Sequence, residues 1–521
     1  MTKSKQYAKS TLMIIIFSLG SKFLGFFREV LLAAKFGSDM ETDVFFIALS
    51  VSGLLGNFLR ETINTTFIPV ISEVESKEGI RGKIEYTNNM INIMFFISAI
   101  LLIIALLGTP IIIKLLAKGF QGKQFDLAVK LTRIGLPTIL FSGVIGVMVG
   151  YLQSEGKFNA TAIIGIPLNL SYIIFLLFLS SFFGVKGLMI SSVIGVIGQL
   201  IIQIPEIKTS SFKYKFVFDI KDKYVKKVLY LSIPILIGVS VSDLNAIIDK
   251  TLASSLVSGS ISALNYANKL NTLILGVFIS AITTVIFPIL SNEANNDNMS
   301  GVKKTMDYGV NLILLITIPA TVGLIILSRP IVEIAFQRGE FDATATIMTS
   351  QALIFYSVGL VAMALRLLIT RVYYSLQDTK SPMINGAISV GFNIVLNLIL
   401  VKFMAHAGLA LATSIATTIA TFLMFYGLKK KIGSLGTKGY IVTFVKSGLA
   451  SAIMGLIAYY TYHSLYSFFG VSKLYNLISL LVAVGIGVIV YGVLCYLFKI
   501  EEVRDMFDKA KSVINRFVKR A

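Results

Sequence analysis

The stretch SLGSKFLGFFREVLLAAKFG, residues 18–37, decides the fold because it joins a membrane-length apolar helix to charges near its middle. A charged side chain at the centre of a bilayer costs about 2.5–3.5 kcal/mol on insertion scales, yet this stretch carries Lys22, Arg28 and Glu29. At about 100° per residue these three side chains fall on one side of a helix with Ser21, opposite a face of Leu, Phe and Val. We therefore expect a membrane helix whose polar face contacts protein or a cavity instead of lipid.

The composition extends this reading to the whole chain. Of its 521 residues 55% are hydrophobic and only 14% are charged, and the mean hydropathy is +0.82. Since a soluble protein carries about 25% charged residues, the chain is predicted to be an all-α polytopic membrane protein. The net charge of +20 then indicates lysines and arginines that orient the helices and contact anionic lipid, and no nucleic acid is expected. A single cysteine and two histidines argue against a disulfide framework, a zinc site or histidine catalysis.

Fourteen apolar stretches of helix length are bounded by turn or charge signals. They lie near 10–36, 43–71, 90–116, 131–152, 159–181, 186–204, 227–255, 262–290, 308–328, 351–376, 382–403, 407–428, 442–463 and 475–498. Lysine and arginine concentrate in alternate loops, above all in 207–227 and 428–440, whereas the loop 37–43 contains none. The positive-inside rule therefore predicts both termini in the cytoplasm, as an even number of spans requires.

The chain repeats itself at a spacing of about 220 residues, or six predicted helices. Gln-Phe-Asp at 124–126 matches Glu-Phe-Asp at 340–342, and YLQSEGK at 151–157 matches YSLQDTK at 374–380. A repeat with an even number of spans returns the chain to the same side of the membrane. We therefore predict two six-helix lobes related by a pseudo-two-fold axis along the membrane normal, with substrate handled between them.

This pattern divides the chain into five predicted parts. They are an N-terminal lobe over 1–204, a basic cytoplasmic linker over 205–226, a C-terminal lobe over 227–428, two added helices over 429–498, and a cytoplasmic tail over 499–521. Apolar residues in the tail recur at helical spacing opposite a charged face. This favours an amphipathic helix on the inner leaflet, with a solvated helix as the alternative.

Other predicted spans also carry polar residues on one side. They are Arg60 and Glu61 in the second, Asp249 and Lys250 in the seventh, Asn268 and Lys269 in the eighth, and Arg366 in the tenth. Two explanations stay open. The charges form ion pairs between helices, such as Arg28 with Glu61 or Asp249 with Lys269, or they line a cavity. The cations outnumber the acids, which favours a cationic cavity for an anionic substrate.

No motif in the chain indicates an enzyme. It contains no P-loop of the form GxxxxGK[ST], no paired-histidine metal motif and no nucleophile elbow. The small residues of GVIGVMVG at 143–150 favour close helix packing over phosphate binding. We therefore predict a transporter without an organic cofactor, whose transport is passive, ion-coupled or driven by the membrane potential.

Several stretches together resemble the MurJ (MviN) family of lipid II flippases, within the multidrug/oligosaccharidyl-lipid/polysaccharide exporter superfamily. They are residues 18–37, TDVFFIALSVSGLLGNFLRE at 42–61, ALNYANKLNTLILGVFISAITTVIFPILS at 263–291, and FQRGEFDATAT with VYYSLQDTKSP between 336 and 382. The resemblance implies a multi-pass protein of the bacterial plasma membrane. It also implies translocation of lipid II, the undecaprenyl-pyrophosphate-linked peptidoglycan precursor, from the inner to the outer leaflet by alternating access.

The resemblance also implies sites. Those for substrate are Lys22, Arg28, Glu29, Arg60, Glu61, Asn268 and Lys269, with a groove for the lipid tail beside the last two spans. Lys22 and Lys269 stand where arginine is usual in the family, whereas Arg28 and Glu29 match the family's arginine–acid pair. Some members bind sodium, and the matching positions are Asp249, Asn393, Asn397 and Thr413, with a carbonyl near Leu409. Polar packing between helices is the alternative for these four residues.

The implied partners are a lipid-linked pyrophosphate, membrane lipids and cell-wall synthesis proteins. Three other functions remain open at this point. They are export of another lipid-linked oligosaccharide, export of drugs within the same superfamily, and a scaffold for wall-synthesis enzymes. A cationic cavity argues against cationic drugs, for which an acidic cavity is expected.

Overall fold

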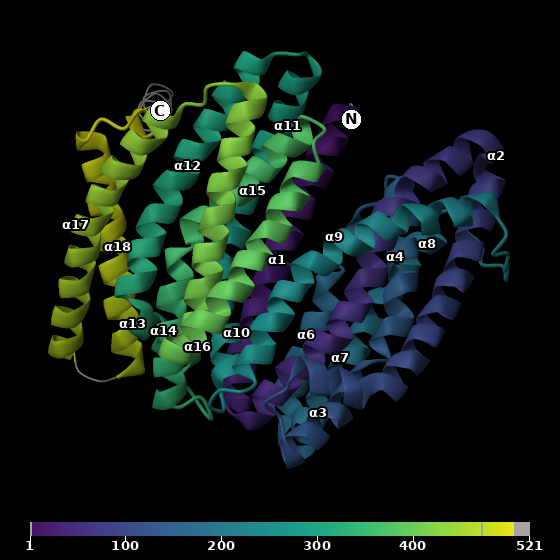
Figure 1. Cartoon of the computed structure of the whole chain (residues 1–521), viewed down its shortest axis with the longest axis horizontal. Helices are drawn as coiled ribbons and strands as arrows, with labels where there is room; N and C mark the ends of the chain where they lie inside the picture. Colours follow the sequence, from purple (N-terminus) through teal and green to yellow (C-terminus); the bar gives the residue numbers. More distant parts are fainter. Residues whose placement is uncertain (1–2, 470–471, 505–521) are drawn as a thin grey trace, which may run out of the picture. The chain divides into compact units, whose positions relative to one another are not determined.

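All regular structure in the described part of the chain is helical. The computed structural model describes residues 3–469 and 472–504, and Figure 1 shows their helices. The elements are α1 (Lys3–Phe36), α2 (Met40–Leu116), α3 (Gly122–Gly135), α4 (Thr138–Ser154), α5 (Asn159–Ala162), α6 (Gly165–Phe178), α7 (Ser180–Ile201), α8 (Ile204–Lys208), α9 (Lys223–Ala253), α10 (Ser260–Ile274), the π-helical turn η1 (Leu275–Ile279), α11 (Ser280–Asn295), α12 (Met299–Ile326), α13 (Ser328–Phe336), α14 (Ala343–Val358), α15 (Leu360–Ser375), α16 (Lys380–Ile432), α17 (Thr437–Phe469) and α18 (Lys473–Leu497). The predicted tail lies outside the described residues from position 505 onward.

Many of these helices are built to cross a membrane. Among the described residues, eight helical stretches are long and apolar enough to span it, or nine if α14 and α15, which meet at a bend of 47°, form one span. Stretches this long and apolar confirm the class that the composition predicted, an all-α polytopic membrane protein.

Two of the helical elements, α2 and α16, are long enough to cross a membrane twice, and each contains a break. α2 has 77 residues and turns back at Gly79, where φ is 70° and ψ is −169°. Only glycine adopts that backbone conformation without strain. α16 has 53 residues and breaks at Ala405, with φ of 47°. Each element is therefore two helices joined by a single residue of positive φ.

The chain forms two compact units. The first comprises Met1–Ser262 with the short segment Arg338–Asp342, and the second comprises Ala263–Gln337 with Ala343–Ala521. The first unit thus includes α9, which follows the predicted linker.

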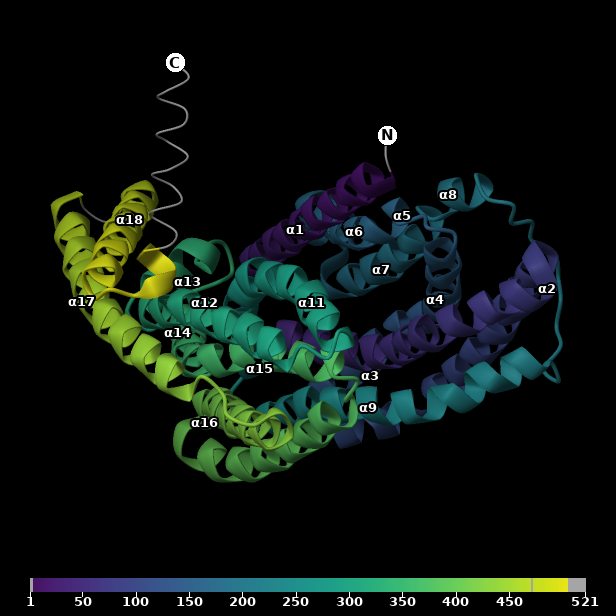
Figure 2. The ribbon, with the colours of Figure 1, turned by 90° about the horizontal axis from the view of Figure 1, so that it is seen from above.

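The core of the first unit joins both halves of α2 to α4 and α9. Phe67 and Tyr86, one from each half of α2, stack with ring centroids 5.4 Å apart, and Tyr151 of α4 and Tyr224 of α9 belong to the same buried cluster. α1 packs along α6, and α6 packs along α7 (Figure 2). The polar face of α1 consequently has protein beside it.

The core of the second unit joins α11, α12, α15 and the second half of α16. Met306, Leu368 and Met424 are buried together there. Beyond it, α17 and α18 run side by side, and α17 packs on α12 (Figure 1). Many large apolar side chains of α17 and α18 remain exposed, as expected of helices that face lipid.

Candidate functional site

Arg28 of α1 lies in a buried polar pocket within the first unit. Its Nη2 donates to Oε1 of Glu29 at 2.5 Å, and the two side chains are 15% and 3% exposed. Its guanidinium also lies 5.0 Å from the ring centroid of Tyr172 in α6, a cation–π contact. The ion partner of Arg28 is therefore its neighbour Glu29, and the alternative pairing with Glu61 is not formed.

Close packing of α1 on α6 brings Tyr172 to Arg28. The Nδ2 of Asn169 donates to the carbonyl of Ser21 at 3.2 Å. A Cβ added at Gly165 would lie 2.4 Å from the Oγ of Ser21, so glycine lets α1 and α6 approach here without displacing that hydroxyl. Sequence reasoning missed Asn169 and Tyr172, although their spacing of three residues places them on one face of α6.

The other predicted substrate residues of the first unit lie on α1 and α2. Lys22 is exposed on α1, about one and a half turns before Arg28. Arg60 of α2 is half-buried and donates to Oδ1 of Asn57 at 3.0 Å, and Glu61 is exposed. The structure thus places a buried arginine–glutamate pair on α1 and accessible polar side chains on α2.

The second unit carries the remaining predicted substrate residues on α10. Asn268 is exposed, Lys269 is half-buried, and the carbonyl of Asn268 accepts a hydrogen bond from Thr272 at 2.8 Å. The π-helical turn η1 follows one turn later. Such turns occur frequently at functional sites because they shift the helix face by one residue.

Three of the four predicted sodium ligands form one chain of hydrogen bonds. Nδ2 of Asn397 donates to Oδ1 of Asn393 at 2.7 Å, and Nδ2 of Asn393 donates to Oγ1 of Thr413 at 3.1 Å. Oγ1 of Thr413 in turn donates to the carbonyl of Leu409 at 3.1 Å. Both asparagines are fully buried. The fourth predicted ligand, Asp249, lies on α9 in the first unit.

The chemistry of this set fits a sodium ion. Amide, hydroxyl and carbonyl oxygens are ligands for hard cations, and rotating an asparagine amide by 180° exchanges its nitrogen for its oxygen. Within residues 3–469 and 472–504, no group of three or more His, Cys, Asp or Glu side chains could hold a metal ion. Any cation at these asparagines would therefore depend mainly on neutral oxygen ligands.

Lys250 of α9 lies beside an apolar cavity in the first unit. The cavity has a volume of about 250 Å³ and is lined by Ile47, Leu54 and Ile112 among others. The Nζ of Lys250 donates to the Oγ of Ser50 on α2. The Ser50 hydroxyl therefore solvates the ammonium group of Lys250, which the sequence analysis placed among the charges of a predicted cavity.

Asp43 in the first turn of α2 is a polar residue that sequence reasoning missed. Its buried carboxylate accepts hydrogen bonds from the backbone N–H groups of Gly259 at 2.8 Å and Ser262 at 2.7 Å. The Oγ of Ser262 donates to it as well, at 2.5 Å. A carboxylate is favourable at a helix N-terminus, so Asp43 fixes where α10 begins. No sequence signal distinguishes it from the other acids of that loop.

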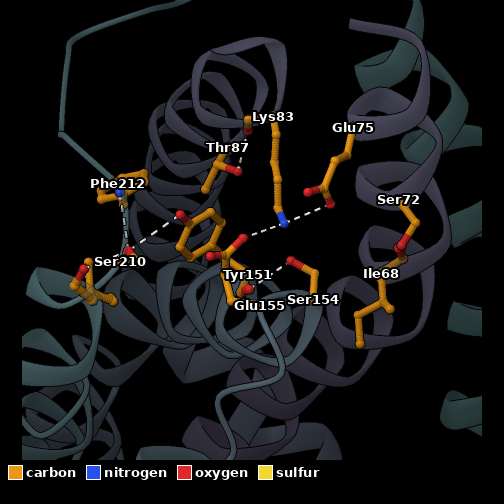
Figure 3. Close-up of polar contacts among 11 residues, drawn as sticks. Ile68, Ser72, Glu75, Lys83, Thr87, Tyr151, Ser154, Glu155, Ser210 and Phe212 are labelled. Carbon is orange, nitrogen blue, oxygen red and sulfur yellow. Dashed lines mark hydrogen bonds and ion pairs between the residues drawn. The ribbon is translucent and has the colours of Figure 1, made fainter. Parts of the chain in front are cut away.

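A second buried cation, Lys83, lies in the segment of α2 between the predicted spans 43–71 and 90–116 (Figure 3). Its Nζ donates to Oε2 of Glu75 at 2.8 Å and to Oε1 of Glu155 at 2.5 Å. The Nζ also lies 5.7 Å from the ring centroid of Tyr151. Lys83 therefore ties the two halves of α2 to the end of α4.

Helices of membrane-spanning length, with buried charged and polar side chains among them, define the class of this protein as a polytopic membrane transporter. Comparison with known proteins narrows the class. The family described as Lipid II flippase MurJ matches residues 32–480. A probable lipid II flippase MurJ from Vibrio cholerae is 32% identical over 439 residues, covering 82% of this chain and 84% of that relative. A lipid II flippase MurJ from Burkholderia cenocepacia is 28% identical, covering 85% and 87%.

Solved structures agree with the sequence relatives. A lipid II flippase MurJ in an inward closed conformation matches with a TM-score of 0.79 and 28% identity, over 95% of this chain and all of that one. An inward-facing multidrug resistance MATE family transporter of the MOP superfamily shares the fold, with a TM-score of 0.67 over 80% of this chain and 98% of that one, at 15% identity. The chain belongs to the lipid II flippase MurJ family. It is accordingly a multi-pass, non-catalytic transporter of the bacterial inner membrane.

Proposed function

We propose that this protein translocates lipid II from the inner to the outer leaflet, and that Arg28 binds the pyrophosphate of the substrate. The observation that carries the proposal is the buried Arg28–Glu29 pair in a chain of this family. A guanidinium has five donors in a planar fork, and its contact with Glu29 occupies one end of that fork. The remaining donors suit the oxygens of a phosphate.

The other predicted substrate residues and Tyr172 each have a distinct part in this mechanism. Glu29 orients the guanidinium and offsets its charge when no substrate is bound, which lowers the cost of burying it. Tyr172 supports the guanidinium from the side through its ring. Lys22, Arg60 and Lys269 supply further positive charge near a translocating anion, and Glu61 and Asn268 supply polar contacts. Alternating access exposes this cationic site first to the cytoplasm and then to the outside.

The proposed topology has fourteen spans in two six-helix lobes with two added helices, and both termini in the cytoplasm. Each of the fourteen predicted stretches coincides with helical structure, once α2 is divided at Gly79, α7 at Gly184 and α16 at Ala405. The excess of lysine and arginine in alternate loops supports the orientation. The exposed apolar surface of α17 and α18 supports a groove for the lipid tail.

We also propose a sodium ion at Asn393, Asn397 and Thr413, together with the Leu409 carbonyl. The hydrogen-bonded chain through these three residues supports it, because rotating the two amides would turn their oxygens, in place of the N–H groups that now donate, toward a cation. The alternative, polar packing alone, predicts a thermal stability that does not change when sodium replaces potassium.

The test of the main proposal is depletion of this protein in cells that depend on it, followed by measurement of lipid II in each leaflet. We expect lipid II to accumulate in the inner leaflet while the amount accessible from outside falls. Normal outward export during depletion contradicts the proposal, and it is the result that a scaffold or a drug exporter predicts.

Purified protein in liposomes separates the remaining alternatives. Fluorescent lipid II, a polyprenyl-pyrophosphate bearing another oligosaccharide, and a cationic drug are compared with a quencher that cannot cross the membrane. We expect lipid II to become accessible fastest. Faster movement of the other lipid-linked saccharide would reassign the substrate, and movement of the drug alone would contradict lipid transport.

A further inference from the structure

A non-helical strap, residues 211–222, links α8 to α9 on the surface of the first unit. Its sequence, SFKYKFVFDIKD, interleaves lysines with aromatic and aliphatic residues. Tyr214, Phe216 and Ile220 are exposed, and Phe216 is 72% exposed. An exposed run of large apolar side chains on a segment held by the fold marks an interaction surface.

Three buried asparagines of α2 hold the backbone of the strap in place. Nδ2 of Asn88 donates to the carbonyl of Lys213 at 3.0 Å, and Nδ2 of Asn92 donates to that of Val217 at 2.9 Å. Asn89 bonds both ways to Asp219, donating to its carbonyl at 2.9 Å and accepting from its N–H at 2.7 Å. These bonds fix the backbone of the strap while Tyr214, Phe216 and Ile220 remain exposed on its surface.

The start of the strap is anchored next to the Lys83 cluster (Figure 3). The hydroxyl of Tyr151 donates to the Oγ of Ser210 at 3.4 Å, and the ring of Tyr151 lies 5.2 Å from that of Phe212. Lys83 is engaged by two carboxylates, so its charge is already balanced inside the protein.

One contact relates the strap to the depth of the membrane. The ring of Phe218 lies 5.5 Å from that of Phe96, in an edge-to-face arrangement. Phe96 is itself half-exposed, and it lies two turns into the predicted span 90–116. The strap therefore crosses the surface at the end of a span, which is the depth of the lipid headgroups.

The exposed lysines of the strap suit a position beside the lipid headgroups. Lys213, Lys215 and Lys221 are exposed and form no ion pair within the part of the chain that the structure describes. The nearby acids serve the backbone, since Asp219 accepts from the N–H of Lys221 and Asp222 caps α9. Lysines near a leaflet attract anionic lipid, and aromatic rings favour the membrane–water interface.

We propose that the strap is a binding surface for anionic phospholipid of the inner leaflet, in which Phe216 enters the interface while Lys213 and Lys215 contact lipid phosphates. This surface would fix the tilt of the first unit relative to the leaflet by holding the cytoplasmic end of α9. It does not depend on which molecule the protein translocates.

The chain contains no tryptophan, so Phe216→Trp introduces a single fluorescent reporter in the full-length protein. The variant is placed in nanodiscs in which either phosphatidylglycerol or phosphatidylcholine carries bromine on its acyl chains, at equal total composition. We expect quenching by both brominated lipids, and about two-fold or more stronger quenching by phosphatidylglycerol. Ile220→Trp reports on the same surface if Phe216→Trp does not fold.

Two matched variants control this measurement. Ile80 is exposed just after the break at Gly79. Ile80→Trp serves as the control for a tryptophan in water, and brominated lipids should not quench its fluorescence. Lys213→Gln with Lys215→Gln should reduce the phosphatidylglycerol preference to about one. Lys429→Gln with Lys430→Gln, also exposed, removes the same charge elsewhere and should leave the preference unchanged.

Three results would overturn the proposal. Emission and quenching of Phe216→Trp equal to those of Ile80→Trp would place the strap in water, available to a cytoplasmic protein. A phosphatidylglycerol preference that survives Lys213→Gln with Lys215→Gln would remove the role of the lysines. A preference that appears only when lipid II is added would assign the surface to the substrate.

Discussion

Two buried cations in the first unit, Arg28 and Lys83, each lie beside a tyrosine ring but are balanced differently. Lys83 is bonded to two carboxylates, those of Glu75 and Glu155. Arg28 has one carboxylate, that of Glu29, and a fork with donors to spare. Lys83 lies between predicted spans and ties three helical segments together, whereas Arg28 lies within a predicted span. We propose that the number of carboxylates bound to each cation distinguishes the structural Lys83 from Arg28, which keeps donors for an anionic substrate.

Lys83→Met should produce the largest change in stability. Breaking a buried ion pair costs about 3–5 kcal/mol, and the cost here should lie near the lower end because both carboxylates are partly exposed to water. Chemical denaturation in mild detergent measures the free energy of unfolding. Lys77→Met, which removes an exposed lysine from the same helix, is the control and should change the free energy of unfolding far less. Equal effects of the two substitutions would show that Lys83 is not a structural tie.

Arg28→Ala should reduce lipid II translocation by about 10- to 100-fold, the worth of one or two charge-assisted hydrogen bonds. Cells that depend on this variant should therefore fail to grow while its protein level stays normal. Arg28→Ala removes the cation that offsets the charge of Glu29, so Arg28→Ala with Glu29→Gln is made as well to restore neutrality. We expect this double variant to regain stability but not translocation in liposomes. Normal growth on Arg28→Ala would make Arg28 dispensable, and recovery of transport in the double variant would make its role structural.

Unlike the two buried cations, the hydrogen-bonded chain of Asn393, Asn397 and Thr413 consists of uncharged side chains. Asn397→Asp tests whether this chain binds sodium. A carboxylate beside Asn393 should strengthen a sodium site, so replacing potassium with sodium should stabilise this variant by about 1 kcal/mol more than the unmodified protein. Thermal unfolding in the two salts measures the difference. Asn385→Asp, on the same helix but outside the hydrogen-bonded chain, should show no such gain. The same response to both salts in Asn397→Asp would favour polar packing alone.

Asp378 forms an ion pair with the exposed Lys431, and both residues lie outside the predicted spans. Asp378→Asn should therefore have the smallest effect on stability. Burial raises the pKa of Asp378, but hydrogen bonds from Lys431 and Ser381 outweigh it and lower the pKa from 3.8 to about 2. A lowered pKa in the folded state stabilises the protein above pH 4, and this contribution disappears as the pH falls through about 2. We expect a loss of less than about 1 kcal/mol at pH 7, shrinking below pH 4. Asp297→Asn is the control, and an equal pH dependence there would contradict the assignment.

Residues within one helix were the easiest to predict. Helical periodicity placed Arg28 and Glu29 on the polar side of one predicted span. Asn393 and Asn397 came from the family resemblance, and their spacing of four residues lies within one helix. Asn169, Tyr172, Asp43 and Lys83 were missed because their partners are distant in the chain. The Asp43 carboxylate, for example, accepts from residues more than two hundred positions away.

The sequence by itself determined the membrane class, the helical segments and the family, because hydrophobic length and local charge are properties of consecutive residues. Only the tertiary structure decided which charges are balanced. In the folded protein Arg28 pairs with Glu29 and not with Glu61, and Lys83 binds two carboxylates. Three asparagines of α2 hold the backbone of the strap by hydrogen bonds. The physical reason is that an ion pair or hydrogen bond depends on distances of about 3 Å between side chains, and helix packing sets those distances.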